Sequence, residues 1–267
     1  MIAIWTSIVN KEVDILIDTR VVSILKENIT VIKNNGKSIY LVGPIQLPVN
    51  LNGETTTFKW YCWLKCEDMA GHFCNDGSYD TEKIIETLSS SNLAEMQQSS
   101  VLVYGDFENE EDALIRMHSI CHTGDIFGSK RCDCGFQLKQ AMKMISDHGT
   151  GALFYLANHE GRGIGLFSKA MAYILQEKGL DTVEANLQLG FVDDSRNYED
   201  AIRVLKTLRT KPVTLITNNP RKLDALKNSG ANVVERVSLW GDVSKYNQKY
   251  LETKIKRSGH FRKQDDQ

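Results

Sequence analysis

The feature that most constrains the fold is an alternation of short apolar runs with amphipathic segments between residues 101 and 239. The apolar runs have the length of strands, and the segments between them repeat apolar residues with the period of a helix. This alternation indicates an α/β fold, a mixed sheet with flanking helices in which some strands pair in parallel. Strands are predicted at Val101–Tyr104, Ala113–Met117, Ala152–Ala157, Val213–Ile216 and Val233–Leu239. Helices are predicted from Leu138 to Gly149, at Leu166–Lys178, at Ala201–Leu208 and from Pro220 to Gly230.

The residues before this region indicate a β-hairpin and then a helix. Ser38–Leu64 has β-rich flanks, and the Asn52-Gly53 pair at its centre is a hairpin-turn signal. A helix is predicted at Glu82–Leu93 from the apolar residues on one of its faces. Three apolar runs nearer the N-terminus are compatible with strands or with a mixture of strand and helix: Val13–Ile17, Val21–Leu25 and Ile29–Ile32.

Composition narrows the partners and the compartment. Hydrophobic residues make up 42% of the 267 residues and charged residues 25%, values typical of a globular protein. The net charge of −2 gives no general reason to expect a nucleic acid polymer or an anionic membrane as partner. No apolar run approaches a membrane span, and the N-terminus lacks the basic start of a signal peptide. Six cysteines in so long a chain do not form a disulfide framework, so we expect a cytoplasmic protein with reduced thiols.

Three of these cysteines lie close together in the polar stretch Arg116–Gln137. Cys121 is followed by the pair Cys132 and Cys134, and three thiolates are soft ligands that suit tetrahedral zinc. Three protein ligands leave one coordination position open, as in catalytic zinc sites. Zinc lowers the pKa of a water in that position to about 7, which makes a nucleophile available at neutral pH.

Other interpretations of the cysteines stay open at this level. They are compatible with small buried apolar residues, or with a structural zinc site closed by a fourth ligand. The many charged and hydroxyl side chains nearby favour an open catalytic site over a dry core. A zinc nucleobase deaminase fits poorly, because its HxE and PCxxC pattern is missing. The residues available as a fourth ligand are His118, His122, Cys62, Cys66 and Cys74.

Two further motifs follow predicted strands, at the place where open α/β sheets bind their ligands. HEGRGIG (159–165) has three glycines that let a ligand approach the backbone, and its Arg162 suits a phosphate group. TNNPRK (217–222) places Thr217 and Lys222 at a helix N-terminus, which attracts anions. From sequence alone, a solvent loop and an ordinary capped helix explain the two motifs equally well.

A third polar motif, FVDDSR (191–196), brings Asp193, Asp194 and Arg196 into one loop. A carboxylate and an arginine this close suit a general base with a positioned cation, although a surface salt bridge is the more common reason for such a pair. Tyr173 lies off the apolar stripe of its predicted helix, so it is not simply a core residue.

Together these motifs resemble the GTP cyclohydrolase II family, whose members catalyse the first step of riboflavin synthesis. The resemblance runs from about Gly43 to His260 and implies three parts: a β-rich N-terminal extension at 1–40, a GTP cyclohydrolase II-like catalytic domain at 41–260 and a flexible tail at 261–267. We expect the chain to fray from Lys254 onward. The matching motifs, in the order of the family, are LPV, VYGD, RMHSICHTGD, RCDCGFQL, HEGRGIGL, DTVEANLQLGF, DDSR, LITNNPRK and YLETKIKRSGH.

The resemblance implies hydrolysis of GTP with opening of the imidazole ring. Formate and pyrophosphate leave, and the product is 2,5-diamino-6-ribosylamino-pyrimidinone 5′-phosphate. The resemblance also implies one Zn²⁺ per chain on Cys121, Cys132 and Cys134, Mg²⁺ on the phosphates, and a homodimer. Among catalytic residues it implies Asp194 as proton acceptor, Arg196 as nucleophile at the α-phosphate and Tyr173 in ring opening. The implied substrate contacts are Arg116, Met117, His118, Ser119, Ile120, Gln137, Glu160, Gly161, Arg162, Thr182, Thr217 and Lys222.

Two residues depart from the family pattern. Ile120 stands where the family has a glutamate before the first zinc cysteine, and His122 replaces an apolar residue. Two alternative hypotheses follow. One is a diverged paralogue that acts on another purine nucleotide or stops at the formamidopyrimidine. The other is a catalytically silent zinc protein that binds a nucleotide, although a binding protein has no need of Tyr173, Asp194 and Arg196.

Overall fold

The computed structural model describes residues 18–34, 36–67, 72, 74 and 78–262. Within these residues, strands and helices alternate after the first 100 residues, as the sequence pattern predicts. The strands are β1 (Ile29–Asn34), β2 (Lys37–Leu51), β3 (Glu54–Glu67), β4 (Ser99–Tyr104), β5 (Leu114–Ser119), β6 (Gly151–Leu156), β7 (Val213–Ile216) and β8 (Val233–Val237). The helices are α1 (Thr19–Lys26), α2 (Thr81–Ser90), α3 (Cys134–His148), α4 (Leu166–Glu177), α5 (Thr182–Gln188), α6 (Glu199–Leu208), α7 (Pro220–Asn228) and α8 (Gln248–Ser258).

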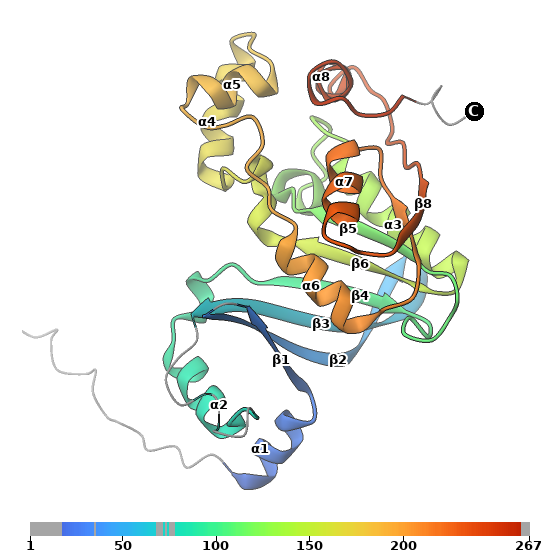
Figure 1. Cartoon of the computed structure of the whole chain (residues 1–267). Coiled ribbons are helices and arrows are strands. Elements are labelled where there is room, and N and C mark those ends of the chain that lie inside the picture. Colours follow the sequence, from blue (N-terminus) through green and yellow to red (C-terminus); the bar gives the residue numbers. More distant parts are fainter. Residues whose placement is uncertain (1–17, 35, 68–71, 73, 75–77, 263–267) are drawn as a thin grey trace, which may run out of the picture.

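The described strands form one sheet in the order β1-β2-β3-β4-β6-β5-β7-β8 (Figure 1). Pairing is antiparallel from β1 through β6, whereas β5 pairs in parallel with both β6 and β7, and β7 with β8. The predicted α/β fold with a mixed sheet is therefore confirmed. The parallel half is the half in which helices connect successive strands, as a parallel crossover requires.

The long hairpin of β2 and β3 confirms the Asn-Gly turn signal. Its register runs from Lys37 opposite Glu67 to Leu51 opposite Glu54. Asn52 and Gly53 have φ angles of 56° and 96°, both in the left-handed region that a two-residue hairpin turn of this kind needs.

The described part of the N-terminal region joins the same sheet. Residues 21–25 form most of α1, so helix is the correct alternative there, and residues 29–32 lie in β1. The run at 13–17 lies outside the described residues. Position 40 falls inside β2, so β1 and β2 continue the sheet across the boundary expected there. The division into an extension, a catalytic domain and a tail stays a prediction.

Helices cover both faces of the sheet. One buried cluster joins alternate residues of β5, such as Ile115 and Met117, to apolar residues of α6 and α7. The other joins Leu114 and Leu153 to α3 through Ala141 and its neighbours. Figure 1 accordingly shows α6 and α7 in front of the sheet and α3 behind it. This two-sided burial explains why the parallel strands are almost continuously apolar.

Helices α4 and α5 lie together in Figure 1, α8 lies on the other side, and α5 contacts α8. Two of them differ from the sequence-based expectations. Helix α5 lies between the helices predicted at 166–178 and 201–208, where the sequence predicted none, and a capping box between Asp181 and Glu184 starts it. The fraying expected from Lys254 is wrong for the described residues, because α8 continues to Ser258 and the backbone N–H of Phe261 donates to Asn218 O at 3.0 Å.

Candidate active site

One cavity lies at the ends of β5 and β7, enclosed by residues of α4, α5 and α8. These strand ends are where a parallel sheet carries its ligand site. All the residues predicted for the site line this cavity except Met117 and Asp194. Met117 lies in the sheet core, and the Asp194 carboxylate contacts a lining residue, Arg196. The location of the other residues in the cavity does not test the catalytic and substrate-binding roles predicted for them.

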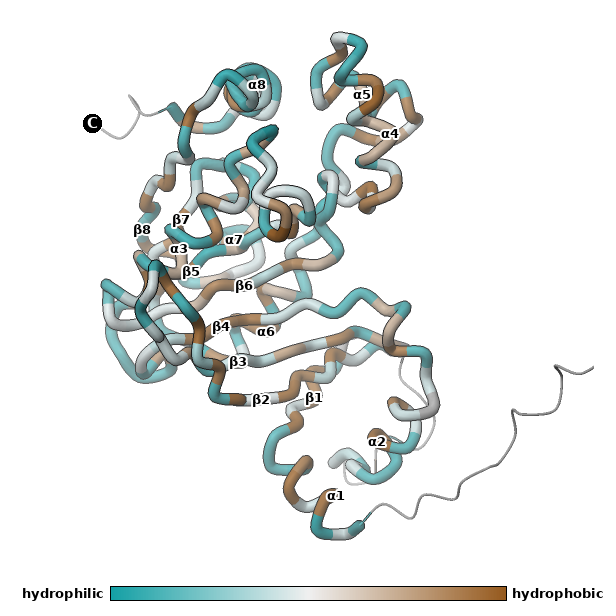
Figure 2. Tube along the Cα trace, turned by 180° about the vertical axis from the view of Figure 1, so that it is seen from behind, coloured by the Kyte–Doolittle hydropathy of each residue, from teal (hydrophilic) through white to brown (hydrophobic). Residues whose placement is uncertain are grey.

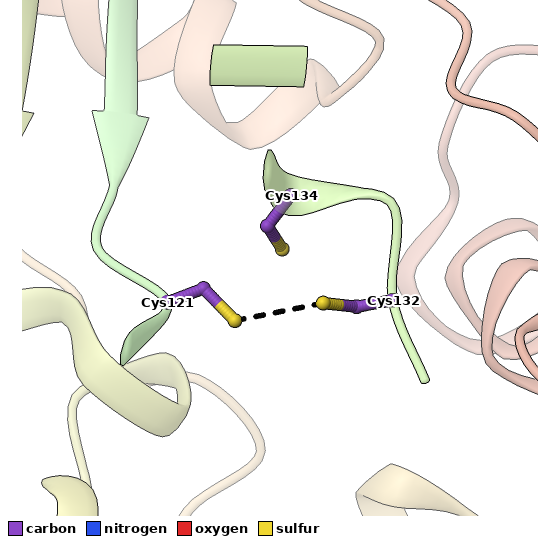
Figure 3. A group of neighbouring side chains, drawn as sticks. All are labelled: Cys121, Cys132 and Cys134. Atoms are coloured by element: carbon purple, nitrogen blue, oxygen red, sulfur yellow. Dashed lines mark hydrogen bonds between the residues drawn. The ribbon is translucent and has the colours of Figure 1, made fainter. Parts of the chain in front are cut away.

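The thiols of Cys121, Cys132 and Cys134 meet at one side of the cavity (Figure 3). All three Sγ atoms lie within 4.8 Å of one another, and Cys121 Sγ is 3.6 Å from Cys132 Sγ. Zn–S bonds of about 2.3 Å in tetrahedral geometry place two sulfurs about 3.8 Å apart. The three thiols are therefore close enough together to share one zinc ion. Among the described residues they are the one group of three or more potential metal-binding side chains.

The backbone brings these cysteines together. Cys121 lies just beyond β5, and Cys134 is the first residue of α3. Between them, a one-turn π-helix at His122–Ile126 packs Gly124 under the sulfurs, where an added Cβ would lie 2.7 Å from Cys132 Sγ. Asp125 holds this turn in place, because its carboxylate accepts from the Cys121 backbone N–H at 2.9 Å and from Tyr155 Oη at 3.0 Å.

The structure does not place the proposed fourth ligands in the cluster. The His122 ring packs edge-on against Phe127 with centroids 4.9 Å apart, and only its backbone N–H points to a site residue, Glu160. His118 Nε2 contacts Asp125. Cys62 and Cys66 lie on β3, and neither they nor Cys74 belong to the thiol group. Among the described residues, the group therefore offers three thiols and no fourth side chain.

A buried lysine that the sequence analysis missed lies beside the cluster. Lys169 Nζ donates to Cys121 Sγ at 3.2 Å and to Glu160 Oε1 at 2.7 Å. Hydrogen bonds from the Cys132 and Cys134 thiols, together with the Lys169 charge, lower the pKa of Cys121 far below that of a free thiol. Burial alone would lower the pKa of Lys169, but the Cys121 thiolate and Glu160 outweigh it and raise that pKa. The site thus favours a thiolate at Cys121, the form that binds metal.

A second network links the cluster to the C-terminal helix. Asp133, which is 3% exposed, accepts from Gln137 Nε2 at 2.7 Å and from Lys254 Nζ at 2.7 Å. Gln137 in turn accepts from Arg116 Nη2 at 2.6 Å. Gly241 packs so closely on Asp133 that an added Cβ would lie 2.3 Å from the Asp133 Cβ. Helix α8 is therefore attached to the loop that carries Cys132 and Cys134.

Another part of the cavity wall is cationic. Arg196 binds Asp194 through Nε at 2.8 Å and Nη2 at 2.6 Å, and Lys222 Nζ donates to Met117 O at 2.7 Å. Burial, together with the charges of Arg196 and Arg116, lowers the pKa of Lys222 well below its usual range. Burial alone would raise the pKa of Asp194, but Arg196 outweighs it and brings that pKa to about 2.

The glycine-rich loop places Arg162 beside this cationic group. Arg162 Nη1 pairs with Asp193 at 2.8 Å, and a Cβ added at Gly163 would lie 2.3 Å from Ser195 Oγ. Only a glycine lets the 159–165 loop approach the 193–196 loop this closely. The two motifs, separate in sequence, thus form one wall of the cavity.

Several buried polar atoms of the cavity have no partner in the described part of the chain. These are Arg116 Nε, His118 Nδ1, Asn186 Nδ2 and Ser258 Oγ. Buried polar groups are normally satisfied, so unpaired ones that line a cavity indicate where a polar ligand binds. The lining residues that the sequence analysis did not single out for the site include Arg131, His159, Lys169, Asn186, Asn218, Asn219, Tyr250, Lys254 and His260.

An α/β fold with a three-cysteine cluster able to hold a metal ion, next to cationic side chains in one cavity, is typical of metal-dependent enzymes that act on anionic substrates. A sequence model of the family described as GTP cyclohydrolase II matches residues 86–238, more than half of the chain. The GTP cyclohydrolase-2 of Histophilus somni (strain 2336) is 51% identical over 160 residues, which are 60% of this chain and 74% of that protein. The GTP cyclohydrolase-2 of Haemophilus influenzae (strain PittEE) is 52% identical over 161 residues, with the same two shares.

The chain therefore belongs to the GTP cyclohydrolase II family, whose members are hydrolases. The family match covers β4 through β8. The thiol cluster and the cationic side chains Arg162, Arg196 and Lys222 all lie on these strands or on the segments between them. It ends before α8, so the contacts of this helix with the site come from the structure alone. None of the described helices is both long and apolar enough to cross a membrane.

Proposed function

We propose that this protein hydrolyses GTP, opening the imidazole ring and releasing formate and pyrophosphate to give 2,5-diamino-6-ribosylamino-pyrimidinone 5′-phosphate. One observation carries the proposal. A three-thiol cluster and a group of arginine and lysine side chains share a single cavity, so one nucleotide can present its purine to the first and its phosphates to the second. The curated relatives named GTP cyclohydrolase-2 support this substrate.

Cys121, Cys132 and Cys134 would hold one Zn²⁺. When bound, the ion supplies Lewis acidity and an activated water for attack on the purine C8. Glu160 and Lys169 form a buried ion pair next to Cys121 and can hold protons at the purine end. Tyr173 Oη lies 3.3 Å from Thr123 Oγ1, and Arg131 stacks 4.1 Å over the Tyr173 ring, so the phenol is fixed at the cavity wall.

The phosphates would bind the cationic wall formed by Arg162, Arg196 and Lys222. Charge-assisted bonds to phosphate are strong in such a buried site. No cluster of three carboxylate or imidazole ligands lies in the described part of the chain, so Mg²⁺ would enter on the phosphates, as it commonly does. The remaining contacts predicted for the nucleotide are Arg116, His118, Ser119, Ile120, Gln137, Gly161, Thr182 and Thr217. The roles of Arg196 as nucleophile and of Asp194 as proton acceptor stay predictions.

We also propose a homodimer. Large apolar side chains are exposed on the elements around the cavity: Ile126, Phe127, Phe136, Leu166, Phe167, Ile174 and Leu187. An exposed apolar surface of this kind is typical of a subunit interface.

Ile120 is the residue that supports the second candidate function, which is action on another purine nucleotide or an incomplete reaction on GTP. It lines the cavity directly before Cys121, where the family resemblance expects a glutamate. A missing carboxylate there would favour another purine nucleotide or an incomplete reaction. Ile120→Glu should then raise turnover of GTP, and unchanged turnover would remove this residue as a determinant of specificity.

The proposed function is tested by one incubation of the zinc-loaded protein with GTP and Mg²⁺, followed by mass spectrometry and assays for formate and pyrophosphate. Release of both, with a diaminopyrimidine monophosphate as product, is the expected result. A nucleotide one water heavier, without formate, would establish the incomplete reaction instead. Unchanged GTP would contradict the proposal and direct the assay to other purine nucleotides.

A further inference from the structure

A serine and a histidine form a hydrogen-bonded pair on the cavity wall. Ser119 Oγ lies 3.2 Å from His159 Nδ1, and His159 Nε2 lies 2.8 Å from the backbone carbonyl oxygen of Asn197. A carbonyl only accepts hydrogen bonds, so the Nε2 atom carries the proton and Nδ1 is the acceptor. Ser119 therefore donates its hydroxyl proton to His159. A nucleophile in reach of a base, with the base oriented by a third group, is the general arrangement for nucleophilic catalysis.

The surroundings keep His159 in its neutral form. It is 1% exposed, and the Tyr198 ring packs edge-on against it with centroids 4.8 Å apart. Burial, followed by the charges of Arg196 and Lys222, outweighs the bond to Asn197 and lowers the pKa of His159 to about 4. At neutral pH the imidazole is thus free to accept a proton.

Arg196 connects this pair to the site proposed for the phosphates. Its Nη1 donates to Ser119 Oγ at 3.2 Å, while Nε and Nη2 are bound to Asp194. Burial would lower the pKa of Arg196, but Tyr198 and Asp194 outweigh it and raise that pKa. A guanidinium that keeps its proton has no lone pair for attack on phosphorus. Its geometry suits holding a phosphate next to the Ser119 hydroxyl.

We propose that Ser119 is the nucleophile at the α-phosphate and that His159 accepts its proton. This inference rests on the proposed function, and it replaces the predicted role of Arg196 as nucleophile by one in which Arg196 holds the phosphate. In the first step, the bond from Ser119 Oγ to the α-phosphorus forms and the bond to the bridging oxygen of pyrophosphate breaks. The hydroxyl proton passes to His159 Nδ1 and then to the leaving pyrophosphate.

The second step returns the enzyme to its starting state. Water attacks the α-phosphorus of the serine ester, and His159 takes one proton of this water. The bond between phosphorus and Ser119 Oγ breaks, and the proton passes from His159 to that oxygen. The nucleotide leaves as a monophosphate, so atoms and charge balance without any other reactant.

One competing explanation is that Ser119 and His159 only position Arg196, which holds the phosphate while water attacks it directly. The stereochemistry at phosphorus separates the two, because a covalent ester on the enzyme requires two displacements and a direct attack by water only one. A covalent bond to Arg196 instead of Ser119 would also give two displacements, and the labelling experiment below separates that case. We would use GTP that is chiral at the α-phosphorus, through sulfur and isotopic oxygen. The proposal expects net retention of configuration in the monophosphate product, and inversion would overturn it.

Variants identify the residue that carries the ester. Ser119→Ala and His159→Gln should each lower pyrophosphate release by about 10²–10⁴-fold, the range for loss of a positioned proton acceptor, with Ser119→Ala at the upper end or beyond. Both should keep their bound zinc, since neither residue is a ligand. Matched controls are Ser146→Ala on the exposed face of α3 and His148→Gln in a surface ion pair with Asp112. These controls should release pyrophosphate at the parental rate.

Labelling locates the ester directly. After a rapid acid quench with GTP radiolabelled at the α-phosphorus, trypsin releases the peptide between Arg116 and Lys130, which contains Ser119. Acid-stable label in this peptide supports the proposal. Acid-labile label at Arg196, or a Ser119→Ala variant with parental pyrophosphate release, overturns it while the proposed function stands. If the parental protein releases neither formate nor pyrophosphate, the proposed function itself fails and this inference falls with it.

Discussion

The proposed zinc site depends on three thiols, and the loss of a single one should have a measurable effect. Cys132 contributes one of three thiols, and with two left the affinity for zinc should fall by more than about tenfold, because thiolate ligands dominate such sites. We therefore expect Cys132→Ser to lose its bound zinc in metal analysis after dialysis. Cys74→Ser, which changes an exposed thiol outside the cluster, should keep one zinc per chain. Full zinc retention in Cys132→Ser would contradict the assignment.

His159 predicts a pH dependence of stability. Its pKa is lowered from 6.5 to about 4 by burial, so the unfolded chain binds the proton more readily than the folded one. The stability that neutral His159 provides is fully present above pH 6.5 and is lost as the pH falls from 6.5 toward 4. The loss amounts to about 3 kcal/mol. Denaturant unfolding of His159→Gln should show a smaller decrease over this range, and an unchanged slope would exclude His159 as its source.

Sequence reasoning identified the residues whose chemistry is unusual for their position, and missed those that look ordinary. Cys121 and Arg196 belong to short polar motifs and were therefore predicted for the site. Lys169 occurs in a helix, where lysine normally faces solvent, and its 8% exposure depends on how α4 packs against Cys121. His159 opened a predicted motif but received no role, because its partners Ser119 and Asn197 are distant in sequence.

Among the helices, α8 is the one whose site contacts were least expected. Its sequence is polar, and Figure 2 shows it mostly in hydrophilic colours, so no apolar stripe predicted that it would pack on the site. Lys254 instead binds the buried Asp133, and Tyr250 and His260 line the cavity. The β2–β3 hairpin, in contrast, was predicted correctly, because its turn signal lies in two adjacent residues. A turn signal between neighbouring residues can be recognised in a single sequence. A tertiary contact that depends on one ion pair between distant residues cannot.

The attachment of α8 gives a prediction at this scale. Lys254→Met leaves the Asp133 carboxylate buried without its cation, which should lower the free energy of unfolding by about 3 kcal/mol. Hydrogen exchange of the α8 amides should become faster at the same time. Lys256→Met, on an exposed pair with Glu252, is the matched control and should change neither quantity. Adding Asp133→Asn to Lys254→Met should restore part of the loss, and no recovery would contradict an electrostatic origin.

For the whole molecule, the exposed apolar residues around the cavity predict how two chains associate. Phe167 is 79% exposed on α4, and a charge there is incompatible with a buried interface. We expect Phe167→Glu to shift sedimentation from dimer toward monomer. Val234→Glu, at an exposed position of β8 away from that surface, should remain dimeric. A Phe167→Glu protein that stays dimeric would show that α4 is not part of the interface.

The short separation of Ser119 and Cys121 along the chain fixes the distance between the two residues. Ser119 is the last residue of β5 and Cys121 lies two residues beyond it, and two residues of extended backbone span about 7 Å. Under the two proposals, the phosphoryl centre and the ring-opening centre are held apart by covalent geometry and not by adjustable side chains. A substrate is then selected by the separation of its C8 atom from its first phosphorus. A nucleotide bound with its base rotated so that C8 points away from the 5′-phosphate does not match that spacing, whichever purine it carries.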